Sequence, residues 1–396
     1  MKTLLVLAAS TYQVDTIKTA KKLGFRVLTA DNRPNNPGHE LADQSYNVDT
    51  TDCTAIMQIA SSQNVSGVIA PCTDVAVPTA AYVSEKLGLP GVPLQAARIL
   101  TNKVTFRKFL QDKKIPSPKY YSISKRNHEL PEISWENGPW IIKPDFSSGS
   151  KGIFVVRDLK ELIERLPQSF CFSPNGTVLI EQFIEGHQGT CEGVLENGRI
   201  RLGVILDRQT AEPPYVVTTG HHLPTELGCS EQARIIERLE IILSCLGVKE
   251  GPFDCDFIIS NGEIFILEMT PRLGGNSISQ LVRITTGFDF VEYAVNHALG
   301  QKNILPNEWA IRPGAVIILG AEDAGILLYN ENETIALKNE TWVHSIKFEA
   351  AIGKRVEKFI NGRHRIGEAF IFASNRNELN NRVFELKARL GIATCN

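Results

Sequence analysis

Short apolar runs alternate with longer amphipathic stretches in the N-terminal quarter of the chain. Three runs have the length and composition of β-strands: residues 3–7, 26–29 and 66–70. The segments that follow them carry apolar residues at helical spacing: residues 12–23, 51–62 and 75–87. Strands separated by helices of this length indicate a parallel, doubly wound α/β sheet, and such sheets bind ligands at the carboxyl ends of their strands.

Polar residues follow each strand of this predicted sheet. The turn after the first strand reads AASTYQ, and because it lacks G-x-G-x-x-G, it argues against dinucleotide binding. Asp31 ends the second strand and is expected to hold a turn. Asp74 follows the third strand, where two interpretations stay open: it caps the next helix, or it pairs with an ammonium group of a substrate.

A β-hairpin is the strongest pattern in the middle of the chain. Residues 257–259 and 264–267 are apolar and β-branched, and Asn261-Gly262 separates them. Asp256 and Glu268 flank these strands, so the hairpin is expected to bring both carboxylates to one end of a sheet. Mg²⁺ prefers one or two carboxylates together with substrate phosphates. The hairpin therefore predicts a magnesium site, with solvated acids on a surface hairpin as the alternative.

A second hairpin is predicted around a loop of small and hydroxyl residues. Strands at 140–143 and 153–156 enclose the sequence PDFSSGSKG. Since the loop joins two strands, it differs from a P-loop, which opens a helix. Its backbone N–H groups could still surround phosphates, with Lys143 and Lys151 adding positive charge; a flexible hairpin tip is the alternative.

Two further segments carry candidate binding residues. The strand at 178–180 ends in Glu181, Gln182 and Phe183, a linker suited to adenine and ribose. Residues 211–225 are expected to form a loop with a His-His pair, of which one histidine at most should face a given site. Helices are expected at 103–112, 231–246, 277–286 and 289–299.

The pattern changes again near residue 303, where short β segments begin at 314–319, 342–348 and 369–373, followed by a helix at 377–390. We expect three domains: a parallel α/β domain over 1–101, a central domain over 102–305 and a small, separate β-rich domain over 306–396.

Composition adds mainly exclusions. The chain carries 42 Lys and Arg against 44 Asp and Glu, so its charge gives no case for binding nucleic acid or an anionic membrane. No apolar run approaches membrane-spanning length, and residues 1–10 read better as a strand than as a signal peptide. The eight cysteines form no C-x-x-C pair and are expected to be mostly reduced core residues of a cytoplasmic protein.

The ordered set of elements resembles the ATP-grasp superfamily of carboxylate–amine ligases. The set comprises a lysine before a Ser/Gly hairpin loop, the linker E-x-F, and two acids flanking an Asn-Gly hairpin that ends in E-x-x-P-R. The resemblance covers the whole chain and implies an ATP-grasp fold with a biotin carboxylase-like parallel N-terminal domain and a small C-terminal domain. Within the superfamily, His221 to Pro224 and the R-L-G-G-N run are most similar to L-amino-acid (dipeptide) ligases.

The resemblance implies a role for each matching residue. Lys103, Lys143 and the flap residues Ser147, Ser148, Gly149, Ser150 and Gly152 would contact the phosphates of ATP, and Glu181, Gln182 and Phe183 would hold adenine. Gln188 or Glu192 would bind the ribose. Asp256, Glu268 and Thr270 would hold Mg²⁺, with Mn²⁺ as an alternative, although the family usually has Glu or Gln at the position of Asp256 and Asn at that of Thr270. Arg272 and Lys143 would be catalytic, and the substrates would contact Asp74, His221, Arg272, Gly275 and Asn276.

The activity implied is amide formation from a small-molecule carboxylate, which is expected to be an amino acid, and an amine, through an acyl phosphate. Two alternatives remain from the sequence: a carboxylase of the purine or biotin type that uses bicarbonate, and a nucleotide-binding regulator without turnover. A homodimer is compatible with the resemblance.

Overall fold

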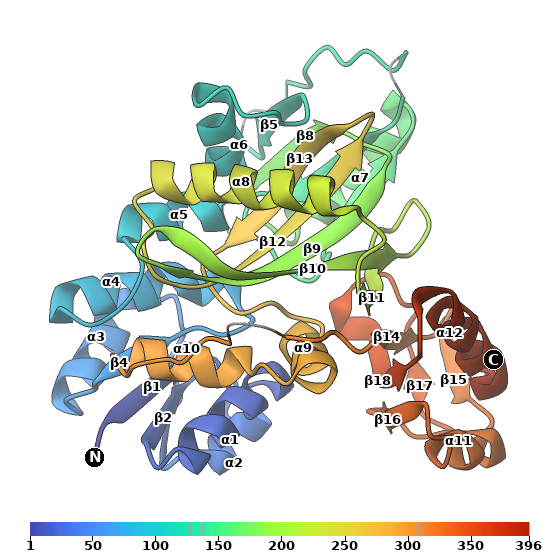
Figure 1. Cartoon of the computed structure of the whole chain (residues 1–396). Coiled ribbons are helices and arrows are strands. Elements are labelled where there is room, and N and C mark those ends of the chain that lie inside the picture. The colour runs from blue at the N-terminus through green and yellow to red at the C-terminus, as the bar shows by residue number, and fades with distance from the viewer. Residues whose placement is uncertain (127–128, 137, 307–308, 396) are drawn as a thin grey trace.

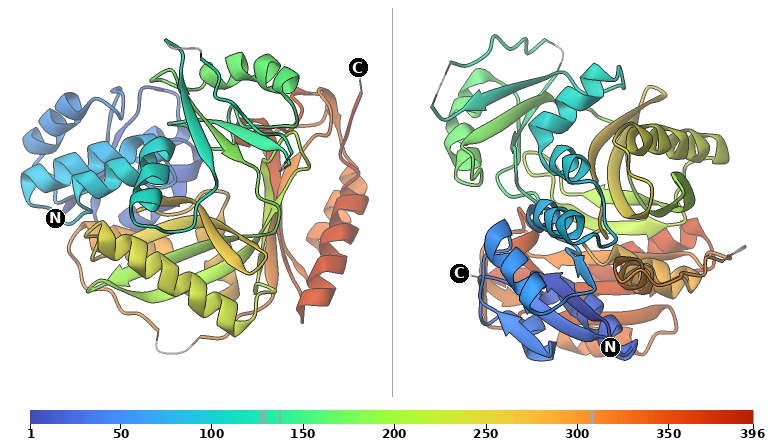
Figure 2. Two further views of the ribbon diagram at one scale, coloured as in Figure 1. Left: turned by 90° about the horizontal axis from the view of Figure 1, so that it is seen from above. Right: turned by 90° about the vertical axis from the view of Figure 1, so that its left-hand side faces the viewer.

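The computed structural model describes residues 1–126, 129–136, 138–306 and 309–395. The middle of the chain lies above two lower parts, the N-terminal sheet and the C-terminal strands (Figure 1). The right-hand view of Figure 2 shows the same layering from the side. The region where the three parts meet holds the site described below.

The N-terminal part is a four-stranded parallel sheet of order β3-β2-β1-β4. Its elements are β1 (Thr3–Leu7), η1 (Thr11–Gln13), α1 (Val14–Lys22), β2 (Arg26–Ala30), α2 (Pro37–Leu41), β3 (Gln44–Tyr46), α3 (Cys53–Ser62), β4 (Gly67–Ile69), η2 (Asp74–Ala76), α4 (Val77–Leu87) and α5 (Leu94–Thr101). One face of the sheet packs Leu5 and Leu28 against α3 and α4. The other packs Leu4 and Val6 against α1 and the later helix α10 (Phe290–Ala298). The predicted parallel sheet is confirmed.

The middle of the chain contains a second, antiparallel sheet of order β5-β8-β6-β7. It follows α6 (Lys103–Asp112) and consists of β5 (Tyr120–Ser124), β6 (Trp140–Pro144), β7 (Phe154–Val156) and β8 (Thr177–Gln182), with α7 (Leu159–Phe170) between β7 and β8. Leu162 and Leu166 of α7 pack on Ile142 and Ile180. The predicted hairpin at 140–156 is therefore present, with the glycine-rich loop at its tip.

The largest sheet has eight strands in the order β13-β12-β9-β10-β11-β14-β18-β16. These are β9 (His187–Glu196), β10 (Arg199–Thr210), β11 (Thr218–Leu223), β12 (Gly251–Ser260), β13 (Glu263–Thr270), β14 (Gly314–Gly320), β16 (Val343–Phe348) and β18 (Arg365–Phe372). Helices α8 (Cys229–Cys245) and α9 (Ile278–Thr286) also belong to this part of the chain. Because β11 pairs with β14, the sheet runs across residue 306, and the C-terminal strands β14, β16 and β18 are part of it.

The C-terminal residues add a small sheet of order β17-β15-β19. Its strands are β15 (Gly325–Leu328), β17 (Arg355–Val356) and β19 (Ala393–Cys395), accompanied by α11 (Glu331–Lys338), η3 (Gly362–His364) and α12 (Arg376–Leu390). Leu379, Leu386 and Leu390 of α12 pack against Ile317 and Ile371 of the large sheet.

The Asn-Gly hairpin is confirmed. Asn261 and Gly262 both have positive φ, 50° and 77°, as the tight turns favoured in hairpins require. Asp256 and Glu268 are directly paired across β12 and β13, beside an irregularity between Asp256 and Phe257. The two strands extend beyond the predicted runs, so the carboxylates lie within the sheet and not at its outer end.

Two sequence expectations are wrong. The His-His pair lies in β11 and not in a loop, because its backbone pairs with β10 and β14 on both sides. The cysteines are all free, but Cys171, Cys229, Cys245 and Cys395 are exposed and only Cys191 and Cys255 are buried. The apolar character of cysteine alone does not show whether the residue lies on the buried or the exposed face of its helix or strand.

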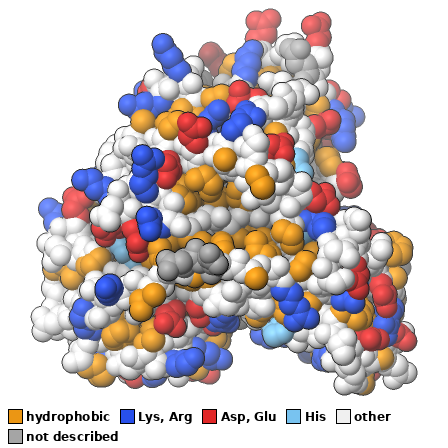
Figure 3. Space-filling view, viewed as in Figure 1, with side chains coloured by type: hydrophobic (Ala, Val, Ile, Leu, Met, Phe, Trp, Pro, Cys, Tyr) orange, Lys and Arg blue, Asp and Glu red, His pale blue; other side chains and the backbone are white. Residues whose placement is uncertain are grey.

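Among the described residues, no helix is both long and apolar enough to cross a membrane. Apolar side chains do gather across the middle of one face, at the levels between α8 and α10, with charged side chains around them (Figure 3).

Candidate active site

A cavity of about 660 Å³ opens where the three parts of the chain meet. Most of the predicted site residues line it: Asp74, Lys103, Lys143, Ser147, Ser148, Gly149, Ser150, Glu181, Gln182, Phe183, Gln188, His221, Asp256, Glu268, Arg272, Gly275 and Asn276. Gly152, Glu192 and Thr270 are not in its lining. The fold thus brings residues from eight separate helices and strands and from three loops to one opening.

Lys103 is the first residue of α6. The helix is capped by Asn102, whose side chain accepts a hydrogen bond from the backbone N–H of Thr105. The Lys103 ammonium lies 2.9 Å from a carboxylate oxygen of Glu268 and donates to the backbone carbonyl of Ser147 at 2.9 Å. Burial lowers the pKa of Lys103, but Glu268 raises it above its usual value overall. Lys103 therefore stays charged and connects the hairpin to the glycine-rich loop.

Lys143 belongs to a buried ion network that sequence patterns did not reveal. Glu181 is fully buried and accepts from Lys143 at 2.6 Å and from Arg107. Arg107 also donates to the carbonyls of Ile266 and Leu267 at 3.1 and 2.6 Å. Burial raises the pKa of Glu181, yet Arg107 and Lys143 outweigh it and bring it to about 2. The Glu181 side chain thus orients Lys143.

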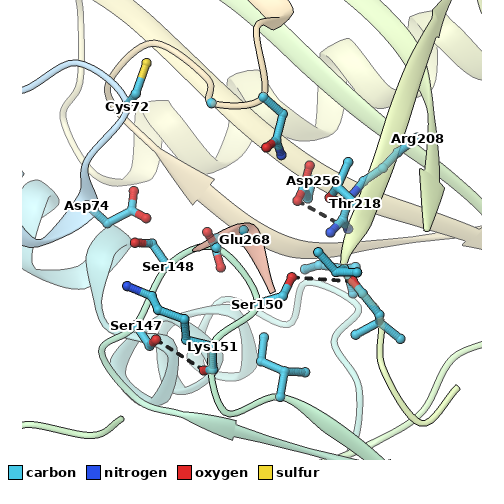
Figure 4. A pocket seen from close by; sticks show the side chains of 18 of the residues that line it. Cys72, Asp74, Ser147, Ser148, Ser150, Lys151, Arg208, Thr218, Asp256 and Glu268 are labelled. Atoms are coloured by element: carbon cyan, nitrogen blue, oxygen red, sulfur yellow. Dashed lines mark hydrogen bonds and ion pairs between the residues drawn. The ribbon is translucent and has the colours of Figure 1, made fainter. Parts of the chain in front are cut away.

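Asp256 and Glu268 point into the same space, across from the flap residues Ser147, Ser148 and Ser150 (Figure 4). Asp256 accepts from the hydroxyl of Thr190 at 2.6 Å and lies 3.3 Å from Arg208. Burial raises the pKa of Glu268, but Lys103 lowers it to about 2, so this carboxylate is ionised.

This pair of carboxylates fits Mg²⁺ bound together with phosphates. Among the described residues, no group of three or more His, Cys, Asp or Glu could hold a metal ion without such a ligand. Mg²⁺ is usually held by one or two carboxylates plus substrate phosphates and waters. Thr270 lies outside the main lining, in a small hollow with Lys103 and Glu268, and its buried hydroxyl has no hydrogen-bond partner.

Arg272 is enclosed by two carboxylates. It donates to Asp74 at 2.6 and 2.9 Å and to Asp254 at 2.8 Å. Asp254 was not singled out in the sequence; it lies two residues before Asp256 and thus on the same face of β12. Burial raises the pKa of Asp254 well above its usual value, and Arg272 only partly opposes this. Asp74 begins η2, and its carboxylate is a partner of Arg272 where a helix cap or a substrate contact was expected.

Glu192 is outside the cavity lining and is completely buried. One of its oxygens accepts from the backbone N–H of Gly274 at 3.1 Å and from the hydroxyl of Ser279 at 2.7 Å. Burial raises the pKa of Glu192 to about 7. Glu192 therefore supports the Gly274-Gly275 turn from behind. Of the two ribose candidates only Gln188 lines the cavity, with its amide donating to the Thr210 hydroxyl at 3.2 Å.

His221 lines the cavity but is only 1% exposed, and neither ring nitrogen has a hydrogen-bond partner. Burial, together with the nearby Arg208 and His222, lowers the pKa of His221 to about 3. The imidazole is therefore neutral near pH 7 and is a weak base there. His222 points the other way, towards Arg376, as expected for neighbours in a strand.

The glycine-rich loop lies over the cavity and touches the C-terminal region. The backbone N–H of Gly362 donates to the carbonyl of Gly149 at 2.9 Å, and the Ser150 hydroxyl lies 3.5 Å from the carbonyl of Val216. Gly149, Ser150 and Gly152 all have positive φ, a conformation that glycine adopts without strain. A Cβ at Gly152 would also meet Phe172 and Pro144 at 2.9 and 3.0 Å, so Gly152 shapes the loop from outside the cavity.

Residues 136–280 match the family model described as "ATP-grasp domain". This chain carries an ATP-grasp domain. The match covers the glycine-rich loop, the Glu181 linker and the hairpin that bears Asp256 and Glu268, which are the elements around the cavity.

Solved structures with the same fold align over the full chain. L-amino acid ligase from Bacillus licheniformis superposes with a TM-score of 0.83 at 20% identity, covering 100% of this chain and 99% of that one. Phosphoribosylglycinamide synthetase from Anaerococcus prevotii superposes with a TM-score of 0.76 at 19% identity, covering 100% of both chains. The predicted fold, an ATP-grasp domain between a parallel N-terminal sheet and a β-rich C-terminal region, is confirmed.

Curated relatives are longer than the matched part of this chain. The uncharacterized protein y4rH of Sinorhizobium fredii is 27% identical over 64% of this chain and 54% of its own length. A carbamoyl phosphate synthase large chain of Clostridium botulinum is 21% identical over 82% of this chain and 29% of its own length. The chain thus spans about half or less of these relatives.

Proposed function

We propose that the protein is an ATP-dependent carboxylate–amine ligase of the cytoplasm, which forms an amide through an acyl phosphate and releases ADP and phosphate. The observation that carries this is one cavity in which Lys103 and Lys143 stand beside the carboxylates of Asp256 and Glu268, under the glycine-rich loop. The ATP-grasp domain match over 136–280 supports the same assignment.

In the first step, an oxygen of the substrate carboxylate attacks the γ-phosphorus of ATP. The new O–P bond forms as the bond to the β-phosphate oxygen breaks, which leaves ADP and an acyl phosphate. Phosphoryl transfer needs mainly positioning and charge stabilisation. Lys103 and Lys143 supply fixed positive charge, and Glu181 holds Lys143 in place.

In the second step, the amine nitrogen attacks the acyl carbon. The C–N bond forms, the C–O bond to phosphate breaks, and phosphate leaves while the nitrogen loses a proton. Arg272 lies where it can stabilise the phosphate, once Asp74 and Asp254 release part of its guanidinium. The neutral His221 can donate or accept one hydrogen bond at the substrate but is not suited to hold the amine proton.

Asp256 and Glu268 would hold Mg²⁺, with Mn²⁺ as an alternative, against the phosphates of ATP. The metal would neutralise phosphate charge as the γ-phosphate is transferred. The protein's own contribution is to hold the two carboxylates opposite each other across the hairpin.

An amino acid is the substrate class we propose for the carboxylate. The cavity combines charged groups with apolar ones such as Ile278, Ile318 and Phe359, which suits a small zwitterion with an apolar part. The likeness in fold to L-amino acid ligase from Bacillus licheniformis supports this choice.

The test is a screen for ADP release with ATP, Mg²⁺ and pairs of amino acids, with bicarbonate as a separate arm. A ligase releases ADP only when both a carboxylate and an amine are present. Release with bicarbonate alone would indicate a carboxylase, and the absence of release with every pair would contradict the proposal.

A further inference from the structure

The charges around the cavity do not balance. Eight lining residues are Lys or Arg, and five of them have a carboxylate partner within 4.0 Å that also lines the cavity. These five are Lys103, Lys143, Arg208, Arg272 and Arg365. The other three, Arg33, Lys151 and Arg363, form no ion pair with any described residue.

These three cations come from three distant segments, each with a fixed backbone. Arg33 lies in the turn held by Asp31, whose carboxylate accepts from the backbone N–H groups of Ala9 and Arg33 at 2.8 and 2.9 Å. Arg363 lies in η3, whose cap is Asn361; the Asn361 side chain accepts from the Arg363 N–H at 2.9 Å.

Lys151 lies in the glycine-rich loop. Its backbone carbonyl accepts from the Ser147 hydroxyl at 3.3 Å, as drawn in Figure 4. Burial lowers the pKa of Lys151 and the nearby Arg363 and Arg33 lower it further, while Asp74 opposes them. Lys151 is thus close enough to Arg363 and to Arg33 to be repelled by both.

An anion bound among these cations would relieve the repulsion that Arg363 and Arg33 exert on Lys151. We propose that Arg33, Lys151 and Arg363 bind a second anionic group of the substrate, a phosphate or an additional carboxylate, apart from the carboxylate that is activated. This rests on the proposed ligase function and narrows its substrate to a dianionic one. Arginine suits such a group because its planar fork grips phosphate or carboxylate oxygens in pairs.

The triphosphate of ATP is a poorer occupant for this cluster. Arg33 and Arg363 lie outside the ATP-grasp domain match at 136–280. The lysines proposed to stabilise the transferred phosphate are Lys103 and Lys143, which lie beside Glu268 and Glu181. If the nucleotide does occupy the cluster, variants of Arg33 and Arg363 will lose nucleotide affinity, which the experiment below measures.

The first test uses inorganic phosphate as the probe on the full chain, saturated with Mg²⁺ and a non-hydrolysable ATP analogue that fills the γ-phosphate position. Calorimetry at constant ionic strength should detect phosphate binding, weakened at least tenfold in Arg33→Ala and in Arg363→Ala. Arg355→Ala is the matched control, since Arg355 is exposed in the same region, forms no ion pair and does not line the cavity. It should change phosphate affinity less than twofold.

Two calorimetric results would overturn the proposal. The first is an adventitious ion only, seen as no phosphate binding or as equal binding in all variants. The second is a loss of affinity for the ATP analogue in Arg33→Ala and Arg363→Ala that is as large as their loss of affinity for phosphate. That result would assign the cluster to the nucleotide.

The second test compares substrates that differ only in the extra anion: serine with O-phosphoserine, and alanine with aspartate. ADP release should be faster with the member of each pair that carries the extra anion, and Arg363→Ala should reduce this preference at least tenfold. The serine pair tests a phosphate as the second anionic group, and the alanine pair tests a carboxylate. Preference for uncharged members would overturn this inference and leave the ligase standing. No ADP release at all would contradict the ligase, while the phosphate titration would still decide whether the anion site exists.

Discussion

Arg272 and Asp74, 198 residues apart in the chain, form a doubly hydrogen-bonded ion pair at 2.6 and 2.9 Å. Asp74 follows the last strand of the parallel sheet and Arg272 follows the Asn-Gly hairpin. The pair therefore ties the carboxyl-end edge of the N-terminal sheet to the segment that follows the hairpin, within the ATP-grasp domain match. Arg272 is also the arginine expected to contact the acyl phosphate, so the substrate has to compete with Asp74 for its guanidinium.

Asp74→Asn should destabilise the fold, because both side chains are about 10% exposed or less. Removing one partner of a buried ion pair costs about 3–5 kcal/mol, and since Asp254 still pairs with Arg272, we expect about 3 kcal/mol. Chemical unfolding followed by tryptophan fluorescence measures the loss. Asp323→Asn, which breaks the exposed pair with Lys358, is the control and should cost less than about 1 kcal/mol. Equal effects of the two substitutions would show that the Asp74 pair does not join the two parts.

Glu268→Ala should abolish turnover while the fold persists, because Glu268 faces Asp256 in the cavity and positions Lys103. Loss of one charge-stabilising group costs on the order of 10²–10³ in rate, and we expect at least this. Glu263→Ala is the control on the same strand, because Glu263 does not line the cavity; it should retain near-normal rates. Near-normal turnover of Glu268→Ala at saturating Mg²⁺ would remove the hairpin from the active site.

The Glu181 network predicts a specific pH dependence of stability. The pKa of Glu181 falls from its ordinary 4.5 to about 2 in the folded protein. A carboxylate with a lowered pKa stabilises the fold above its unfolded pKa, and this contribution, about 3 kcal/mol here, is lost as the pH falls from about 5 to 2. The difference in unfolding free energy between the wild type and Glu181→Gln should therefore shrink over that range. A difference that stays constant from pH 6 to pH 3 would contradict the network.

The glycine-rich loop should close over ATP. Lys151 offers trypsin a cleavage site within it, and only a few contacts, such as Gly149 to Gly362, hold it. Trypsin should cut at Lys151 in the free protein and much more slowly with Mg²⁺ and a non-hydrolysable ATP analogue, since the closed loop excludes the protease. Mass spectrometry of the fragments identifies the cut. Equal rates with and without the analogue would count against a flap.

His221 and Asn276 should affect the reaction and not nucleotide binding. His221→Ala and Asn276→Ala are expected to change turnover or substrate preference while ATP affinity stays within about threefold, or roughly 0.7 kcal/mol. The pKa of His221 is about 3, so titration of this histidine should not shape the pH–rate profile near pH 6.5. A change of rate near pH 6.5 that is lost in His221→Ala would contradict this neutral role of His221. Unchanged turnover of both variants across the substrate panel would contradict a role in the reaction.

Local patterns were sufficient to predict the hairpin, the parallel sheet and the glycine-rich loop. The backbone conformations that Asn261 and Gly262 favour are enough to predict the turn. Once the turn is set, the register of the two strands places Asp256 opposite Glu268. The helix at 103–112 was predicted with the bounds that the structure gives.

Residues whose role depends on distant partners could not be predicted in the same way. Arg107 looks like any helical arginine until folding places it beside Glu181, 74 residues away. Asp254 shares its strand face with Asp256, and that spacing was the one signal that could have identified it. The strand containing His221 was missed because its stability comes from pairing with β14, almost 100 residues later.

The central claim is that the substrate carboxylate attacks the γ-phosphate of ATP. It is tested most directly by running the reaction with a carboxylate labelled with ¹⁸O and measuring the label in inorganic phosphate by ³¹P NMR or mass spectrometry. Formation of an acyl phosphate predicts one ¹⁸O in the released phosphate for each amide formed, with ADP as the nucleotide product. Unlabelled phosphate, or release of AMP and pyrophosphate with the label in AMP, would contradict the proposed function.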